Sequence, residues 1–287
     1  MLRPIGVVVL LLCVFASACE ATKSPNEPSP PPAANEVHYT AIGASDAIGY
    51  GASIPCLPFA SCPSGTGYVQ TIARQFQSSG KVVTLMNLGI PGAVLGPDIQ
   101  ALGASIGRDI FGNFLNQEVP FVPRDSTVIT VFAGGNDVNT VGAAIEAGKA
   151  GSNVHAFIQA QTQNFARDLQ LMLTGIRDRA PQARIVVLNL PNMAGIPYAS
   201  GYSLDKKRAL QQIAVAFSAQ INALTAQNAL VVDLMCDATI YQANLYSSDG
   251  FHPNDAGYAR LAAVTYAVAS TGTGTPPRLS CAQMTLF

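Results

Sequence analysis

From residue 37 onward, short apolar runs alternate with longer stretches of helical periodicity. The runs are apolar nearly throughout, which indicates strands buried on both faces, as in a parallel sheet covered by helices. Between the runs, apolar residues recur every three or four positions. The pattern predicts strands at 37–43, 82–89, 127–135, 184–191 and 230–235. It predicts helices at 68–79, 154–180, 204–228 and 254–270.

Polar motifs stand where these predicted strands end. Ser45 follows the first strand, Gly92 the second and Asn136 the third. Asp249 and His252 lie in the loop between the fifth strand and the last helix. Ligands of an open α/β sheet bind at the carboxyl ends of its strands. We therefore expect these motifs to meet at one edge of the sheet.

A nucleophilic serine needs a base and a third group that orients the base. The chain has three histidines: His38 enters the first strand, His155 heads a long helix, and His252 alone follows a carboxylate by three residues. We interpret Ser45, His252 and Asp249 as a catalytic triad. The alternative for His252 is a surface or capping residue before the last helix.

The oxyanion that forms during serine attack needs donors fixed in advance. The backbone N–H groups of Ser45 and Gly92 and the side-chain amide of Asn136 can supply them. An alternative role for Gly92 is that of a turn glycine with positive φ, and an alternative role for Asn136 is to stabilise its own turn.

Taken in order, these motifs resemble the four blocks of the SGNH, or GDSL-type, hydrolase family over residues 37–270. Ser45 in IGASDAIG matches the nucleophile, Gly92 in NLGIPG and Asn136 in GGND match the oxyanion residues, and DGFH matches the D-x-x-H pair. The resemblance implies a flavodoxin-like three-layer α/β/α sandwich with about five parallel strands.

The sequence departs from the family pattern at one place. The G-D-S motif reads Gly43-Ala44-Ser45, and an acid follows the serine instead of preceding it. This puts in doubt any role of the preceding acid, but leaves the triad intact.

A rival nucleophile is Ser105, at the centre of GASIG, which matches the G-x-S-x-G elbow of α/β-hydrolases. That elbow requires a strand before the serine. The preceding segment, which contains Pro97 and Asp98, is a poor strand, and we therefore favour Ser45.

The composition limits the partners. Charged residues make up 11% of the 287 residues, the formal net charge is -1, and there is no basic run, so the sequence offers no surface for nucleic acid. We expect a monomer. The triad requires neither a cofactor nor a metal.

The N-terminus predicts export. Residues 1–18 have the layout of a signal peptide, and ASAC at 16–19 is open to two interpretations, simple cleavage or lipidation of Cys19 in a bacterial lipoprotein. Residues 19–36 are proline-rich and predict a tether. The hydrolase domain would then span 37–287, in the cell envelope or secreted.

The remaining cysteines form two pairs along the chain, which we expect to be Cys56–Cys62 and Cys236–Cys281. Four cysteines allow three connectivities, and the sequence does not exclude the other two. Metal binding is disfavoured because neither pair has C-x-x-C spacing. The second bridge would dock the C-terminal tail.

The sequence as a whole predicts an exported serine esterase that acts on short to medium acyl or lipid esters. Met193, Ile196 and Tyr198, in a loop after the fourth strand, are candidates for lining a substrate pocket, with an ordinary packed loop as the alternative. Two other functions are open. One is a carbohydrate O-deacetylase or glycan acyltransferase using the same triad, and the other is a non-catalytic, surface-tethered binding protein.

Overall fold

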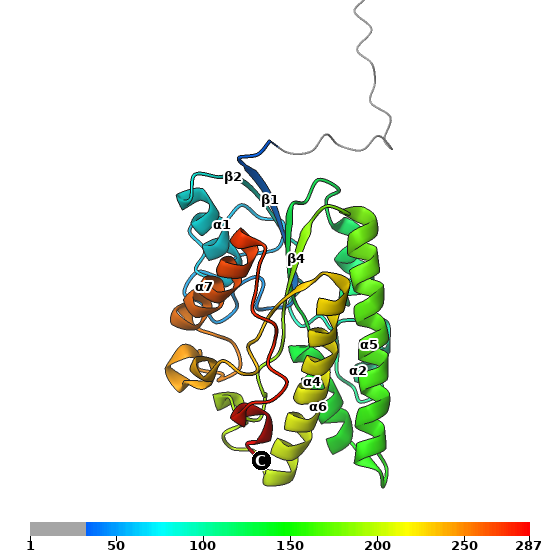
Figure 1. Ribbon diagram of the computed structural model, residues 1–287. Helices are drawn as coiled ribbons and strands as arrows, with labels where there is room; N and C mark the ends of the chain where they lie inside the picture. The colour runs from blue at the N-terminus through cyan, green and yellow to red at the C-terminus, as the bar shows by residue number, and fades with distance from the viewer. Residues whose placement is uncertain (1–32) are drawn as a thin grey trace, which may run out of the picture.

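The computed structural model describes residues 33–287 and contains a parallel sheet with strands in the order β2-β1-β3-β4-β5 (Figure 1). The predicted leader, Cys19 and the proline-rich segment up to residue 32 lie outside the described residues. The strands are β1 (Glu36–Gly43), β2 (Val82–Asn87), β3 (Val128–Phe132), β4 (Arg184–Leu188) and β5 (Leu230–Val232). All five strand predictions are confirmed, with shorter C-terminal ends in β2 to β5.

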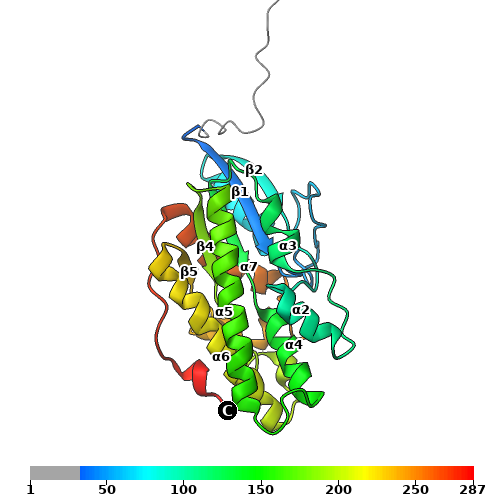
Figure 2. The same ribbon diagram turned by 90° about the vertical axis from the view of Figure 1, so that its right-hand side faces the viewer.

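Helices cover both faces of the sheet (Figures 1 and 2). The α-helices are α1 (Tyr68–Ser78), α2 (Pro97–Ala104), α3 (Phe114–Gln117), α4 (Gly135–Glu146), α5 (Val154–Arg179), α6 (Leu204–Ala223) and α7 (Asp255–Thr271). Helices α1 and α7 pack together on one face, and α2 to α6 form the layer on the other. The predicted α/β/α sandwich is therefore confirmed. Short 3-10 helices span Val119–Phe121, Pro197–Ala199, Leu224–Gln227, Ala238–Tyr241, Ala243–Leu245 and Ala282–Thr285.

The sheet separates two apolar cores because its inner strands β1, β3 and β4 are buried on both sides. Tyr39 on β1 packs with the α1 and α7 layer, whereas Ile42 on β1 and Ile129 on β3 pack with the opposite layer. Such continuous burial explains why the strands read as apolar runs without polar alternation. Within residues 33–287, no helix combines the length and apolar character needed to cross a bilayer.

Three helices, α2, α3 and α4, were not predicted from the sequence. Helix α4 begins at Gly135, within the segment predicted as strand and turn, because Gly134 adopts a left-handed conformation (φ 108°) and ends the strand. Helix α2 begins with Pro97, whose fixed φ suits the first turn of a helix. Glycine, asparagine and proline read locally as turn residues, and packing against the core makes the α2 and α4 segments helical.

The order of the strands places a switch point between β1 and β3. The chain leaves β1 toward β2 on one side, and later returns to β3 on the other. Connections therefore diverge at the carboxyl ends of β1 and β3, where open α/β sheets commonly bind their ligands. Ser45 follows β1 and Asn136 follows β3, so both residues lie at this edge of the sheet.

Candidate active site

Ser45 is presented by a tight turn directly after β1. The Ala47 N–H donates to the Ala44 carbonyl (3.1 Å), and the Tyr50 N–H donates to the Ser45 carbonyl (2.9 Å). From the end of β2, the Asn87 side chain donates to the Ala47 carbonyl (2.7 Å). Ser45 is 7% exposed, so its hydroxyl is held in a nearly closed environment.

The structure brings Ser45, His252 and Asp249 into one hydrogen-bonded chain. Ser45 Oγ lies 2.8 Å from His252 Nε2, although the two residues are 207 positions apart in the sequence. His252 Nδ1 lies 2.6 Å from Asp249 Oδ2. Because an ionised carboxylate only accepts, Nδ1 donates to Asp249. In the neutral imidazole, Nε2 is then the acceptor for the Ser45 hydroxyl, as a general base requires.

Asp249 is stabilised in its ionised form. Its Oδ1 accepts from the backbone N–H groups of Phe251 and His252 (both 2.9 Å) and from the Ser247 hydroxyl (2.8 Å). Burial by itself would raise the pKa of this carboxyl, but the hydrogen bonds from His252, Phe251 and Ser247 outweigh burial and lower the pKa to about 2. Asp249 therefore carries its charge throughout the neutral range.

The turn after Ser45 also touches the loop that carries His252. Gly51 has a φ of 91°, and a Cβ at this position would lie 2.8 Å from the Pro253 carbonyl oxygen and 2.9 Å from the His252 Cβ. The imidazole packs between the rings of Tyr50 (4.6 Å between centroids) and Phe251 (4.8 Å). Glycine at 51 thus permits the close approach that brings the two motifs together.

Three groups are candidate donors for an oxyanion: the N–H groups of Ser45 and Gly92 and the side-chain amide of Asn136. Gly92 adopts the positive φ that its motif allowed (77°). Among the described residues, the N–H groups of Ser45 and Gly92 donate to no other backbone group. One hydrogen of the Asn136 amide is donated to the Ala93 carbonyl (3.0 Å), which fixes the amide and leaves its second hydrogen for a ligand.

Two buried carboxyl groups that sequence reasoning did not single out brace these loops. Glu118, which is fully buried, accepts from the Gly43 N–H (2.8 Å), and burial raises its pKa well above the usual value. Asp137, also fully buried, accepts from the Leu95 N–H (3.0 Å) and so ties the start of α4 to the loop after β2. The only sequence signal for Asp137 was its position directly after Asn136.

The pH dependence of stability, compared between the wild type and Asp137→Asn, tests the role of the buried Asp137 carboxyl. Burial raises the pKa of Asp137 to about 7, in spite of the Leu95 hydrogen bond. Because the pKa is raised on folding, the contribution of this group to stability is complete below about pH 4 and is lost as the pH rises through about 7. We expect the unfolding free energy of the wild type to fall, relative to that of Asp137→Asn, by on the order of 2 kcal/mol between about pH 5 and pH 8.

Urea unfolding at several pH values measures this difference. Asp178→Asn, on the exposed side of α5, is the matched control and should follow the wild type at every pH. A parallel pH dependence for the wild type and Asp137→Asn would show that the buried carboxyl does not titrate in this range.

Ser105 lies away from this constellation. It is exposed at the C-terminal end of α2, and its hydroxyl donates to the Leu102 carbonyl (2.8 Å). The residues before Ser105 are helical, and the strand that a nucleophile elbow requires is absent from the described segment preceding it.

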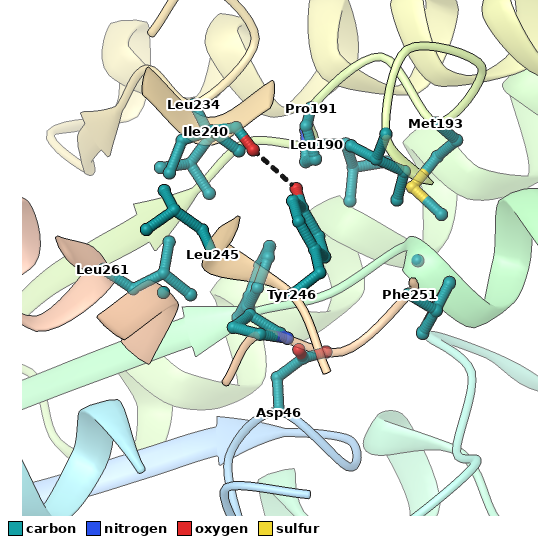
Figure 3. A pocket seen from close by; sticks show the side chains of 15 residues that line it. Asp46, Leu190, Pro191, Met193, Leu234, Ile240, Leu245, Tyr246, Phe251 and Leu261 are labelled. Carbon is teal, nitrogen blue, oxygen red and sulfur yellow. Dashed lines mark hydrogen bonds between the residues drawn. The ribbon is translucent and has the colours of Figure 1, made fainter. Parts of the chain in front are cut away.

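A narrow apolar cavity of about 50 Å³ lies beside the triad (Figure 3). Residues next to each site motif contribute to its wall: Asp46 follows Ser45, Gly135 precedes Asn136, and Phe251 and Pro253 flank His252. The remaining wall consists of Phe132, Leu190, Pro191, Met193, Ile196, Leu234, Ile240, Leu245, Tyr246, Gly257 and Leu261. The cavity therefore adjoins the segments that carry the site motifs, although Ser45, Asp249 and His252 are not among its lining residues.

Two of the three residues predicted to contact substrate belong to this wall. Met193 and Ile196 line the cavity and are each 3% exposed. Tyr198 is not among the lining residues. It packs edge-on against Phe251 (5.2 Å), and its N–H donates to the Gly250 carbonyl (2.9 Å). Its position indicates that it supports the loop of His252.

Disulfides join Cys56 to Cys62 and Cys236 to Cys281, which is the pairing expected from the sequence. The second bridge anchors the C-terminal segment. Beyond it, the Asn192 side chain donates to the Gln283 carbonyl (2.7 Å), and Gln211 accepts from the Leu286 N–H (2.8 Å). The end of the chain therefore packs behind the loop that supplies Met193 and Ile196.

Comparison of the sequence with known protein families identifies one matching family. The family described as GDSL-like Lipase/Acylhydrolase matches residues 41–260. No curated protein matches the sequence.

Solved structures share the fold at low sequence identity. The lipase Lip_vut3 from a goat rumen metagenome is similar with a TM-score of 0.54 and 20% identity, over 85% of this chain and 100% of the lipase. Phospholipase A1 from Streptomyces albidoflavus NA297 gives a TM-score of 0.52 and 18% identity over 79% and 97% of the two chains. A mutant of the acetyl-xylooligosaccharide esterase Axe2 from Geobacillus gives 0.52 and 15%, over 85% and 97%.

Proposed function

The chain belongs to the GDSL-like lipase/acylhydrolase family of ester-hydrolysing enzymes, and from this premise we propose that it is an exported serine esterase that works through an acyl-serine intermediate. The observation that carries the proposal is the continuous hydrogen-bonded chain from Ser45 through His252 to Asp249. The two disulfides support export, since such bonds persist in oxidising compartments.

The geometry supports the following reaction. His252 Nε2 takes the proton of the Ser45 hydroxyl while Oγ attacks the ester carbonyl carbon, and the carbonyl oxygen becomes an oxyanion. The N–H groups of Ser45 and Gly92 and the free hydrogen of Asn136 stabilise the oxyanion. The intermediate then expels the alcohol, which leaves with the proton from His252, and the acyl group remains on Ser45.

Water completes the cycle. His252 removes a proton from a water molecule, which attacks the acyl carbon, and the second tetrahedral intermediate releases the carboxylic acid as the proton returns to Ser45 Oγ. Asp249 keeps its charge and stabilises the imidazolium in both halves of the reaction. Through these steps His252 acts first as a base and then as an acid.

The cavity supports short to medium acyl groups as substrates. Its walls are almost wholly apolar, and Met193 and Ile196 are buried in them. An acyl chain bound to Ser45 Oγ would gain from burial at these walls, until its length exceeds the room between them.

A series of p-nitrophenyl esters from acetate to dodecanoate tests the proposal. We expect kcat/KM of the purified protein to be highest for chains up to about hexanoate and to fall by about tenfold or more for dodecanoate, because extra methylenes overpack the cavity. Hydrolysis confined to acetylated sugars, or rates that keep rising to the longest chain, would contradict the proposed substrate class.

A further inference from the structure

Glu118 is an acidic residue in the apolar interior of the protein. It is 0% exposed and lies between α3 and the 3-10 helix Val119–Phe121, in a segment whose Phe114 and Val119 belong to the core. Its Oε2 accepts from the Gly43 N–H (2.8 Å), whereas its Oε1 has no hydrogen-bond partner in the described part of the chain. The triad and the oxyanion donors do not include this acid, so its presence here needs an explanation.

An apolar side chain of similar length would fill this place at lower cost, because a buried carboxyl oxygen without a partner is unfavourable. Burial has the largest influence on the Glu118 carboxyl and raises its pKa well above the usual value, although the N–H groups of Gly43 and Ile90 act in the opposite direction. The neutral acid is thereby favoured, and it still has an oxygen that accepts a hydrogen bond. The bond to Gly43 is therefore what distinguishes Glu118 from an apolar residue.

Gly43 connects the two segments that are proposed to perform the reaction. It precedes Ser45 by two positions, and it packs so closely on the turn that follows that a Cβ on Gly43 would clash with that turn. Its carbonyl accepts from the N–H of Ile90 (3.1 Å), which precedes Gly92 by two positions. Glu118 thus holds the N–H of a residue whose carbonyl holds the loop that carries Gly92.

The reaction depends on where these two segments lie relative to each other. Ser45 Oγ attacks the ester carbon while the N–H groups of Ser45 and Gly92 receive the developing negative charge, so all three must reach the same carbonyl group. A displacement of about 1 Å in such a set can lower the rate by about 100-fold. Without Glu118, the buried N–H of Gly43 would lose its acceptor, and the end of β1 would be free to shift toward another.

We propose that Glu118 is a positioning residue for ester hydrolysis: through Gly43 it fixes Ser45 relative to the loop that carries Gly92. This inference rests on the proposed esterase function and deepens it. In this role Glu118 neither contacts the substrate nor transfers a proton. Its loss should therefore lower kcat more than it changes KM, because the bound ester meets a displaced nucleophile.

Two substitutions of similar size separate the hydrogen bond from the space that the side chain fills. Glu118→Met removes the acceptor, whereas Glu118→Gln keeps a neutral acceptor oxygen. With p-nitrophenyl butyrate, we expect Glu118→Met to lower kcat by about 10- to 100-fold with KM changed less than about threefold, and Glu118→Gln to stay within about threefold of the wild type. Steady-state kinetics measure both constants, and thermal unfolding followed by circular dichroism shows whether each variant is folded.

The reaction with diethyl p-nitrophenyl phosphate gives a second measurement, which does not depend on an acyl group. Ser45 Oγ bonds to phosphorus, its proton passes to His252, and p-nitrophenolate leaves with the electron pair of the broken P–O bond. The oxyanion donors assist this step as they assist attack on an ester. We expect its second-order rate constant to fall in Glu118→Met by a factor similar to that for kcat, and to recover in Glu118→Gln.

Thr40→Val is the matched control for the loss of a buried hydrogen bond. Thr40 lies on β1, is 1% exposed, and places its hydroxyl 2.8 Å from the Ser126 hydroxyl. The variant should lose stability but keep the kcat of the wild type, because the lost bond ties β1 to the residues before β3 and not to the loop that carries Gly92.

Three results would overturn the positioning role while leaving the esterase function intact. They are a folded Glu118→Met with the kcat of the wild type, a Glu118→Gln as impaired as Glu118→Met, and an equal loss of kcat in Thr40→Val. If Glu118→Met does not fold, Glu118→Leu is the second apolar variant, and the same results are expected of it. Absence of ester hydrolysis in the wild type would overturn the proposed function itself.

Discussion

Ser45→Ala is expected to lower kcat/KM for p-nitrophenyl butyrate by about 10⁴-fold or more, to near the background rate. The substitution removes one oxygen atom, the proposed nucleophile, which lies 2.8 Å from His252 Nε2. Without it no acyl-enzyme can form, and the remaining groups can only bind the ester. The variant should fold, because the turn around Ser45 is held by backbone bonds and by Asn87. Thermal unfolding followed by circular dichroism checks this expectation.

Ser105→Ala is the matched control for the nucleophile. It deletes the same atom from the serine of the GASIG motif, whose hydroxyl bonds only to the preceding helix. We expect full activity within experimental error. If Ser45→Ala kept substantial activity and Ser105→Ala lost it, the assignment of the nucleophile would be wrong, and the interpretation as a tethered binding protein would be excluded as well.

Asp249→Asn is expected to reduce kcat by about 10³–10⁴-fold with a smaller change in KM. The carboxylate now fixes the proton on His252 Nδ1 through a bond of 2.6 Å and balances the imidazolium charge. An amide at this position can present its N–H₂ to Nδ1, which would leave the proton on Nε2 and prevent that atom from accepting from Ser45. Steady-state kinetics with p-nitrophenyl butyrate separate kcat from KM.

The control for this carboxylate lies three residues beyond His252. Asp255 accepts hydrogen bonds from Ser53 and Thr66 at the start of α7, away from the imidazole, so Asp255→Asn should stay within a few-fold of the wild type. Since the pKa of Asp249 is lowered to about 2, its contribution to stability is present above about pH 4 and is lost only as the pH falls toward 2. Wild-type kcat for Asp249→Asn would remove Asp249 from the triad.

The order of elements was readable from the sequence because the sheet is buried on both faces. Strands such as β3 and β4 are apolar throughout, and long helices such as α5 show a regular apolar face, so both signals are local. The start of α4 was predicted wrongly as strand and turn. Its first residues, Gly135 and Asn136, have low helix propensity, and the helix forms because Val138 and Val141 are buried against the core.

Within the candidate site, contacts between residues close in the sequence were predictable, and contacts between distant residues were not. The bonds from Asp249 to the N–H groups of residues 251 and 252 span two and three positions, so the D-x-x-H spacing already indicates them. The role of Glu118 at Gly43 was not predictable, because 75 positions separate the two residues and no motif marks the acid. The cavity was only partly predicted: the sequence suggested Met193 and Ile196, but also Tyr198, which supports the histidine loop from behind.

The sequence by itself determined the candidates for the chemistry of this protein: a serine, a histidine and a carboxylate of the right types, placed after apolar strands, with glycine and asparagine beside them. These properties follow from residue identity and short-range periodicity. Only the tertiary structure decided that Ser45 contacts His252 across 207 positions, and that Met193 and Ile196, but not Tyr198, line an apolar cavity. Such long-range contacts depend on how the helical layers pack against the sheet, because a side chain contacts only those residues that the fold brings within a few ångströms of it.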